Sequence, residues 1–89
     1  MTTIYKYPMK RSNDPLQIEL PYGAKFLCMQ EQFGVQCLWY QVEAGAHKEN
    51  KEIFIYGTGY QITNVENQKY LGTFQEMGGS LIWHVYQEI

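Results

Sequence analysis

The segment Leu16-Gln17-Ile18-Glu19-Leu20 alternates apolar and polar residues without a break, and a proline follows it directly. Because successive side chains of a β-strand point to opposite faces, this pattern predicts a strand whose apolar side chains are directed into a core. Proline lacks the backbone N–H that a central strand uses, so Pro21 marks the end of the strand. The segment therefore predicts a sheet that is buried on one face.

Turn-forming residues recur along the rest of the chain about every ten residues, and no window of about eleven residues has helical periodicity. This spacing is typical of all-β folds. The sequence predicts a small antiparallel β-sandwich or barrel of about six to seven short strands with minimal helix. A chain of 89 residues has room for one core, so we expect a single β domain over residues 1–89.

The composition of individual segments places the expected elements. We expect strands over residues 3–7, 16–20, 53–56, 70–74 and 81–86, a hairpin over residues 25–42 with Phe33-Gly34 near its tip, and a second hairpin that turns at residues 77–80. Polar residues predict a turn over Lys10–Pro15, a mobile exposed loop over Glu43–Lys51 and one helical turn within Asn64–Lys69.

Strand alternation also predicts which side chains share a face. In the first hairpin we expect Leu27 and Met29 on one face, and Trp39 on the side opposite its two neighbours. If the loop of this hairpin spans residues 31–34, Cys28 lies directly across from Cys37. Two cysteines fit a reducing compartment better than a secreted disulfide scaffold, so we expect two reduced, partly buried thiols.

Charge and composition favour some classes of function and weaken others. The formal net charge is −2 and the pI is near 5.6, without a cluster of Lys or Arg, which weakens a nucleic-acid interpretation. The amino-terminal residues resemble neither a secretory signal nor a membrane span, so we expect a cytoplasmic protein. An aromatic content of 16% in so small a domain predicts that some rings face a ligand or another chain, and a homo-oligomer is expected.

Four stretches of the chain carry a resemblance to a known family. They are Lys6-Tyr7-Pro8, residues 21–27 leading to Leu38-Trp39, residues 55–59 and residues 78–85. On these stretches the chain resembles a family of small uncharacterised proteins of tailed bacteriophages and prophages. The resemblance implies a phage accessory protein that acts by binding a host factor. Relatives often carry His at the position of Tyr60, so the resemblance does not imply a proton-transfer role for this tyrosine.

The strongest local motif is Gly57-Thr58-Gly59 after a predicted strand. Glycines let a backbone approach closely, and successive N–H groups form anion-binding nests, so the motif is a candidate phosphate cradle. It lacks the Lys-Ser/Thr ending of a P-loop, and a plain tight turn is the simpler interpretation. Candidate stacking rings for a bound base or sugar are Tyr56, Tyr60, Trp39, Trp83 and Tyr86, and their alternative role is packing in the core.

His84 lies on a predicted strand and completes the set of candidate ligand-binding residues, which are Gly57, Thr58, Gly59, Tyr60, Trp39, Trp83 and His84. A histidine within a strand more often makes a structural hydrogen bond. No metal site is predicted, because neither His47 nor His84 has a ligand neighbour at metal spacing. No motif activates either cysteine, so no cofactor and no catalytic residue is predicted.

These observations lead to three alternative hypotheses about the function of the protein. The leading hypothesis is a non-catalytic phage accessory protein that inhibits or sequesters a host protein, or a small nucleotide-type defence signal. The alternative is a small β-barrel that binds single-stranded nucleic acid on aromatic rings, which the acidic balance disfavours. A small hydrolase is the second alternative and has the least support.

Overall fold

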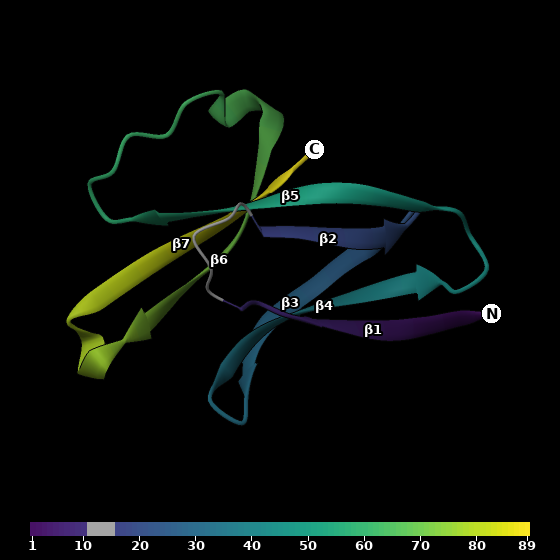
Figure 1. Cartoon of the computed structure of the whole chain (residues 1–89), viewed down its shortest axis with the longest axis horizontal. Helices are drawn as coiled ribbons and strands as arrows, with labels where there is room; N and C mark the ends of the chain where they lie inside the picture. The colour runs from purple at the N-terminus through teal and green to yellow at the C-terminus, as the bar shows by residue number, and fades with distance from the viewer. Residues whose placement is uncertain (11–15) are drawn as a thin grey trace.

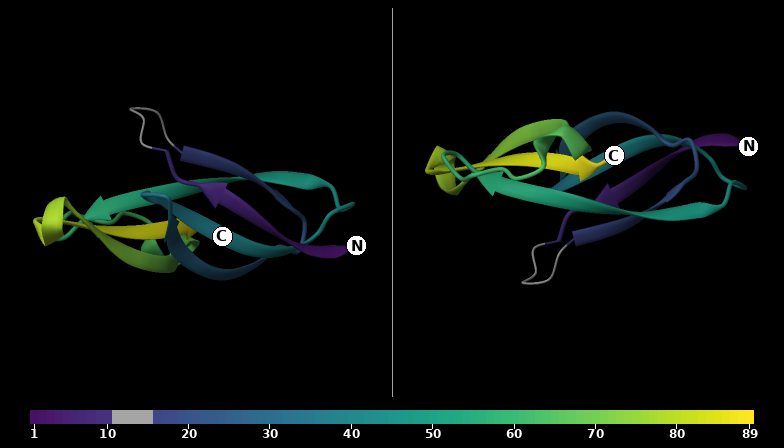
Figure 2. Two further views of the ribbon diagram at one scale, coloured as in Figure 1. Left: turned by 90° about the horizontal axis from the view of Figure 1, so that it is seen from below. Right: turned by 90° about the horizontal axis from the view of Figure 1, so that it is seen from above.

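The computed structural model describes residues 1–10 and 16–89, which form seven strands in two antiparallel sheets (Figure 1). The three-stranded sheet has the order β1 (Thr2–Pro8), β4 (Val35–Glu43) and β3 (Lys25–Gln32). The four-stranded sheet has the order β2 (Leu16–Pro21), β5 (Lys48–Gly57), β7 (Leu81–Glu88) and β6 (Gln68–Glu76). No described strand of one sheet pairs with the other, so the predicted all-β fold is confirmed as a sandwich and not a closed barrel (Figure 2).

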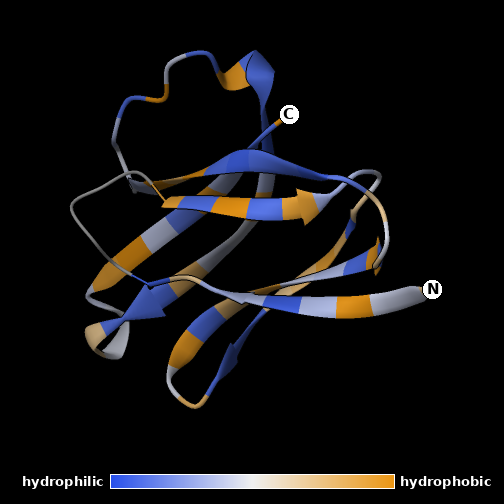
Figure 3. Cartoon of the chain, turned by 45° about the vertical axis from the view of Figure 1, so that its right-hand side comes forward, coloured by the Kyte–Doolittle hydropathy of each residue, from blue (hydrophilic) through white to orange (hydrophobic). Residues whose placement is uncertain are grey.

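The core lies between the two sheets and follows the alternation seen in the sequence. In β2, Ile18 and Leu20 are buried, Leu16 is half-buried and the polar residues between them are exposed. Figure 3 shows the same alternation as bands of orange and blue along this strand. The buried apolar cluster consists of Met9, Ile18, Leu20, Leu38, Tyr40, Val42, Ile53, Leu71 and Val85. Both sheets therefore contribute to one core.

Helix is confined to two short 3-10 turns in the described part of the chain, η1 (Val65–Asn67) and η2 (Met77–Gly79). The helical turn expected within residues 64–69 is confirmed, but Asn64 does not cap it through its side chain. Asn64 instead takes a left-handed backbone conformation, with φ 57°, which asparagine tolerates better than most residues. Neither described helix is long enough or apolar enough to cross a membrane.

The first hairpin turns as expected at Phe33-Gly34, but its register differs from the expected one. Both turn residues have positive φ, 50° and 80°, as a two-residue type I′ turn requires. This tight turn pairs Gln32 with Val35, and it places Cys28 across from Trp39 and Cys37 across from Gln30. The expected pairing of the two cysteines is therefore wrong, because it assumed a loop of residues 31–34.

A β-bulge in β3 overturns a second expectation about this hairpin. The register shifts between Phe26 and Cys28, and an extra residue in one strand reverses the faces beyond it. Phe26 and Met29 pack against the core, whereas Leu27 is exposed. Leu27 and Met29 therefore do not share a face.

The connection between β4 and β5 is shorter than the predicted loop over Glu43–Lys51. It comprises residues 44–47, and β5 already begins at Lys48 because residues 48–51 pair with residues 18–21 of β2. These polar residues belong to a strand since the pairing supplies their backbone hydrogen bonds while leaving most side chains exposed. The turn predicted over Lys10–Pro15 lies, for residues 11–15, outside the described residues.

Candidate functional site

The outer surface of the four-stranded sheet carries two rows of side chains that cross its strands. Phe54 on β5 lies opposite Tyr86 on β7, which lies opposite Tyr70 on β6. One step along the strands, Tyr56 lies opposite His84, which lies opposite Thr73 on β6. Their neighbours along the strands, such as the fully buried Val85, point into the core. Strand alternation therefore directs both rows away from the core.

The rings on this surface contact one another. The ring centroids of Tyr70 and Tyr86 are 5.3 Å apart, and those of Tyr56 and Tyr86 are 5.6 Å apart, both in edge-to-face geometry. Phe54 and Tyr56 stack with an interplanar angle of 11° and a centroid distance of 6.3 Å. Such pairs stabilise each other by about 0.5–1.5 kcal/mol beyond the area that they bury. We call Phe54, Tyr56, Tyr70, Tyr86 and His84 the outer aromatic face.

A chain of hydrogen bonds fixes His84 within this face. The Thr58 hydroxyl lies 2.7 Å from His84 Nε2, and the Thr73 hydroxyl lies 2.9 Å from His84 Nδ1. The Tyr70 hydroxyl in turn lies 2.5 Å from Oγ1 of Thr73. Both ring nitrogens of His84 therefore have a hydroxyl partner at hydrogen-bond distance. This arrangement orients the ring, and it presents hydroxyl and imidazole groups beside the aromatic rings.

The predicted motif Gly57-Thr58-Gly59 forms a tight turn at the end of β5. The N–H of Tyr60 donates to the carbonyl of Gly57 over 3.1 Å, and Gly59 has φ 89°, a conformation that favours glycine. The Tyr60 ring folds back onto Gly57, where an added Cβ atom would meet it at 3.1 Å. The N–H of Tyr60 is therefore hydrogen-bonded within the turn, and the Thr58 hydroxyl lies at hydrogen-bond distance from His84.

The structure brings together only part of the predicted ligand-binding set. The turn of residues 57–60 and His84 lie side by side, as the hydrogen bond from Thr58 shows. Trp83 lies on the core side of β7, and its indole N–H donates to Glu76 over 2.8 Å. Trp39 belongs to the other sheet, where the Lys6 amine lies 6.0 Å from its ring centroid. The two tryptophans are therefore not part of the outer aromatic face.

A cavity of about 280 Å³ adjoins the outer aromatic face, between β5 and the segment that follows the turn. Its lining consists of Phe54, Tyr56, Thr63, Asn64, Asn67, Gln68 and Glu88. The Tyr56 hydroxyl donates to the side-chain carbonyl of Gln68 over 2.9 Å, and the Gln68 amide donates to the carbonyl of Thr63 over 3.0 Å. These hydrogen bonds fix the positions of the Tyr56 and Gln68 side chains in the wall of the cavity. Its rings, amides and single carboxylate suit neutral or cationic hydrogen-bonding groups.

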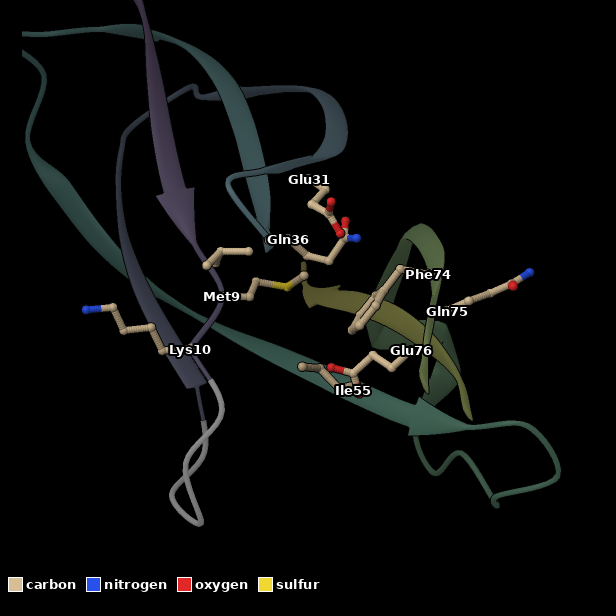
Figure 4. Close-up of a pocket in the computed structure, with 10 residues that line it drawn as sticks. Met9, Lys10, Glu31, Gln36, Ile55, Phe74, Gln75 and Glu76 are labelled. Atoms are coloured by element: carbon tan, nitrogen blue, oxygen red, sulfur yellow. The ribbon is translucent and has the colours of Figure 1, made fainter. Parts of the chain in front are cut away.

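A second cavity, of about 310 Å³, opens between the two sheets at the end where β1 terminates (Figure 4). Met9, Ile55 and Phe74 form its apolar walls, and Glu31 and Glu76 lie at its margin. Figure 4 shows the Lys10 amine pointing away from the other side chains. None of the predicted ligand-binding residues lines this cavity, which opens into the core between the two sheets.

Within residues 1–10 and 16–89, the residue types of a nucleophilic site do not lie together. Both cysteines belong to the three-stranded sheet, and Cys37 is only 2% exposed. His84 lies on the outer surface of the other sheet and is bonded to two threonines. Across the residues that the structure describes, no three His, Cys, Asp or Glu side chains are placed to hold a metal ion.

The family model named Domain of unknown function (DUF7352) matches residues 1–89. The chain belongs to this family. No curated protein and no solved structure matches the chain. For this DUF7352 chain the candidate site therefore rests on the geometry of its own residues.

Sequence reasoning missed three members of the site in this DUF7352 chain, which are Phe54, Tyr70 and Thr73. Strand alternation was an available signal for Phe54, because the segment that carries it presents an aromatic residue at every second position. Alternation could not place Tyr70 and Thr73 together, because these residues are three apart and share a face only through the register shift between Tyr70 and Gly72. Alternation assigns a residue to a face of its own strand. It does not show which strands are neighbours, so the rows became visible only in the assembled sheet.

Proposed function

We propose that this chain is a non-catalytic binding protein that engages a partner protein through the outer aromatic face. The supporting observation is the continuous contact of four aromatic rings across three neighbouring strands on a surface directed away from the core. Following the resemblance to phage and prophage proteins, we infer that the partner is a host factor, which the chain inhibits or sequesters.

The chemistry of the face matches that of a protein interface. The cores of such interfaces are enriched in aromatic residues and depleted of charged ones, with charges placed at the rim. The two rows contain rings, hydroxyls and an imidazole, whereas the carboxylates of Glu52 and Glu88 lie beyond Phe54 toward the sheet end. Tyr70 is 52% exposed, so part of this surface is open to a partner. A polypeptide with apolar and basic side chains fits it.

The nucleotide-type defence signal and the single-stranded nucleic acid have less support. Phosphate recognition relies on Lys, Arg or free backbone N–H groups. None of the described residues that line the adjoining cavity is a Lys or Arg, and Glu88 is negative. The N–H of Tyr60 is already bonded within the turn. The hydrolase alternative gains no support, because the cysteines and His84 lie on different sheets.

The test compares two exposed tyrosines. Tyr70→Ala removes a ring of the face, and Tyr22→Ala removes a tyrosine of similar exposure at the turn after β2, 62% against 52%. The wild-type chain and both variants are immobilised, exposed to bacterial lysate and analysed by quantitative mass spectrometry. We expect one specific protein to bind the wild type and Tyr22→Ala, and to bind Tyr70→Ala about 30-fold less, as for a hot-spot residue.

Equal retention by Tyr70→Ala and Tyr22→Ala would contradict the assignment of the face. A thermal-shift screen with nucleotides, cyclic dinucleotides and short oligonucleotides tests the alternatives in parallel. A ligand at 100 times its dissociation constant stabilises the fold by about 2.7 kcal/mol. Such a shift, abolished by Thr58→Ala, would favour a nucleotide ligand over a protein partner.

A further inference from the structure

Strand β1 lies at the edge of the three-stranded sheet. It pairs with β4 on one side, and none of the described elements pairs with its other side. The N–H of Met9 donates to the carbonyl of Gln36, and the N–H of Ala44 donates to the carbonyl of Met1, each over 2.9 Å. Because bonded and non-bonded pairs alternate in an antiparallel ladder, the odd-numbered residues of β1 bond to β4.

The even-numbered residues of β1 therefore turn their backbone groups away from β4. Thr2, Ile4 and Lys6 each offer an N–H and a carbonyl at the free edge, whereas Pro8 offers only a carbonyl. An edge with a regular row of unpaired groups is a template for a further strand. The spacing of these residues is symmetric about Ile4.

We propose that two copies of this chain form a dimer by pairing their β1 strands antiparallel about a two-fold axis at Ile4. In this register Thr2 faces Lys6 of the second copy, and Ile4 faces Ile4 of the second copy. Each of these pairs exchanges two N–H···O bonds. Every N–H at the free edge of β1 then has an acceptor, and Pro8 falls beyond the paired stretch. The product is a continuous six-stranded sheet.

The side chains are complementary in the same register. Ile4 is 57% exposed, and at the two-fold axis it packs against its copy. Lys6 lies beside Thr2 of the second copy, and the next residue in that row is Glu43, because Thr2 lies opposite Glu43 within each chain. The symmetry therefore places Lys6 of one copy and Glu43 of the other in one cross-strand row, with Thr2 between them, twice.

Lys6 is the charged residue of β1 that could protect this edge from pairing with another strand, but its side chain is directed away from the edge. The Lys6 amine donates to the side-chain carbonyl of Gln32 on β3 over 2.6 Å. It therefore reaches across β4, over the Trp39 ring. Charged side chains protect an edge only where they stand over it, so the edge of β1 remains accessible.

The other three edge strands are less suited to pairing with a copy. Both β3 and β6 contain a bulge, which interrupts a ladder. In β2 the N–H of Tyr22 donates to the carbonyl of His47 over 2.7 Å, so the residues that face outward are Gln17, Glu19 and Pro21. A symmetric pairing of β2 would place Glu19 against Glu19 and leave the proline without a donor. We therefore expect two copies of the chain to pair through β1 and not through β2, β3 or β6.

Light scattering with size exclusion at micromolar concentration tests the proposal. We expect twice the chain mass of 10.5 kDa for the wild type, and 10.5 kDa for Ile4→Lys, which places two lysines together at the two-fold axis. Gln17→Lys is the matched control, with a lysine at an outward-facing position of β2, and it is expected to remain a dimer. Circular dichroism of each variant confirms that it is folded.

A wild-type mass of 10.5 kDa, or a dimer that persists in folded Ile4→Lys, would overturn the proposal. Cross-linking gives an independent measurement. Bonded pairs in an antiparallel ladder have Cα atoms about 5.5 Å apart, within disulfide range. With Cys28→Ser as background, Ile4→Cys should give a covalent dimer on mild oxidation, and Gln17→Cys should not.

Discussion

The Tyr40 hydroxyl on β4 donates a hydrogen bond of 2.5 Å to the side-chain carbonyl of Gln87 on β7, and so joins the two sheets of the sandwich. Tyr40 is only 1% exposed, and its ring meets those of Tyr7 and Phe26 edge to face at 5.6 and 5.4 Å. The tyrosine therefore fills the centre of the core with its ring, and it satisfies its polar end on the opposite sheet.

Tyr40→Phe keeps the ring and removes this hydrogen bond. We expect the free energy of unfolding to fall by about 1 kcal/mol, the usual net contribution of such a bond. Urea denaturation at pH 7 measures the change. Tyr22→Phe, at an exposed position, is the control and should leave the free energy within a few tenths of a kcal/mol. An unchanged midpoint for Tyr40→Phe would show that the bond contributes nothing.

The same residue predicts a pH dependence. Burial raises the pKa of the Tyr40 hydroxyl, with a further contribution from Tyr7, whose own pKa burial also raises. A folded-state pKa above the unfolded value of about 10 means that the unfolded chain releases the proton first. This stability is complete below about pH 10 and is lost as the pH rises toward the folded-state pKa. Tyr40→Phe should make stability decline less steeply between about pH 10 and 11.

Gly59 is predicted to be required for its backbone conformation. At φ 89° a side chain is strained, so Gly59→Ala should cost about 1–2 kcal/mol. Gly45 has open space where a Cβ would be added and no positive φ, so Gly45→Ala should be neutral or slightly stabilising. Thermal denaturation of the two variants distinguishes the positions, and equal melting temperatures would refute the conformational explanation.

The two cysteines are predicted to stay reduced and to differ in reactivity. Cys28 lies opposite Trp39 and Cys37 opposite Gln30, which makes the cysteines diagonal neighbours on adjacent strands, about 7–8 Å apart at Cα. This separation is too long for a disulfide. Cys28 is half-buried and Cys37 is 2% exposed, so a thiol reagent should label Cys28 first. A mass two units low after mild oxidation would contradict the register.

The two tryptophans should respond differently to replacement by phenylalanine. Trp83→Phe removes a hydrogen bond to the Glu76 carboxylate, whereas the buried indole N–H of Trp39 has no hydrogen-bond partner among the described residues. Losing a bond to a charged group costs about 1.5–3 kcal/mol, and removing an unpaired buried donor relieves a penalty. We therefore expect Trp83→Phe to be the more destabilising by about 1 kcal/mol or more. Guanidinium denaturation provides the comparison.

Local patterns predicted much of the strand structure. The alternation around Ile18, the turn at Phe33-Gly34 and the glycines near Met77 each depend on residues close in sequence. Two errors arose where the number of residues in a strand or loop differed from the expected one. The bulge at Leu27 adds one residue, and a shift of one residue exchanges the faces of a strand. The turn at Phe33-Gly34 has two residues instead of four, which moves the register of Cys28 and Cys37 by two residues.

The sequence by itself determined that this chain is an all-β domain, and it placed Trp39 on the side of its strand opposite Leu38 and Tyr40, since side-chain alternation is a local property of an extended backbone. Only the tertiary structure decided that Thr58 and Thr73 meet His84, and that Trp39 lies on the other sheet. These relations depend on which strands become neighbours and in which register, and strand pairing is made by contacts between residues far apart in the chain.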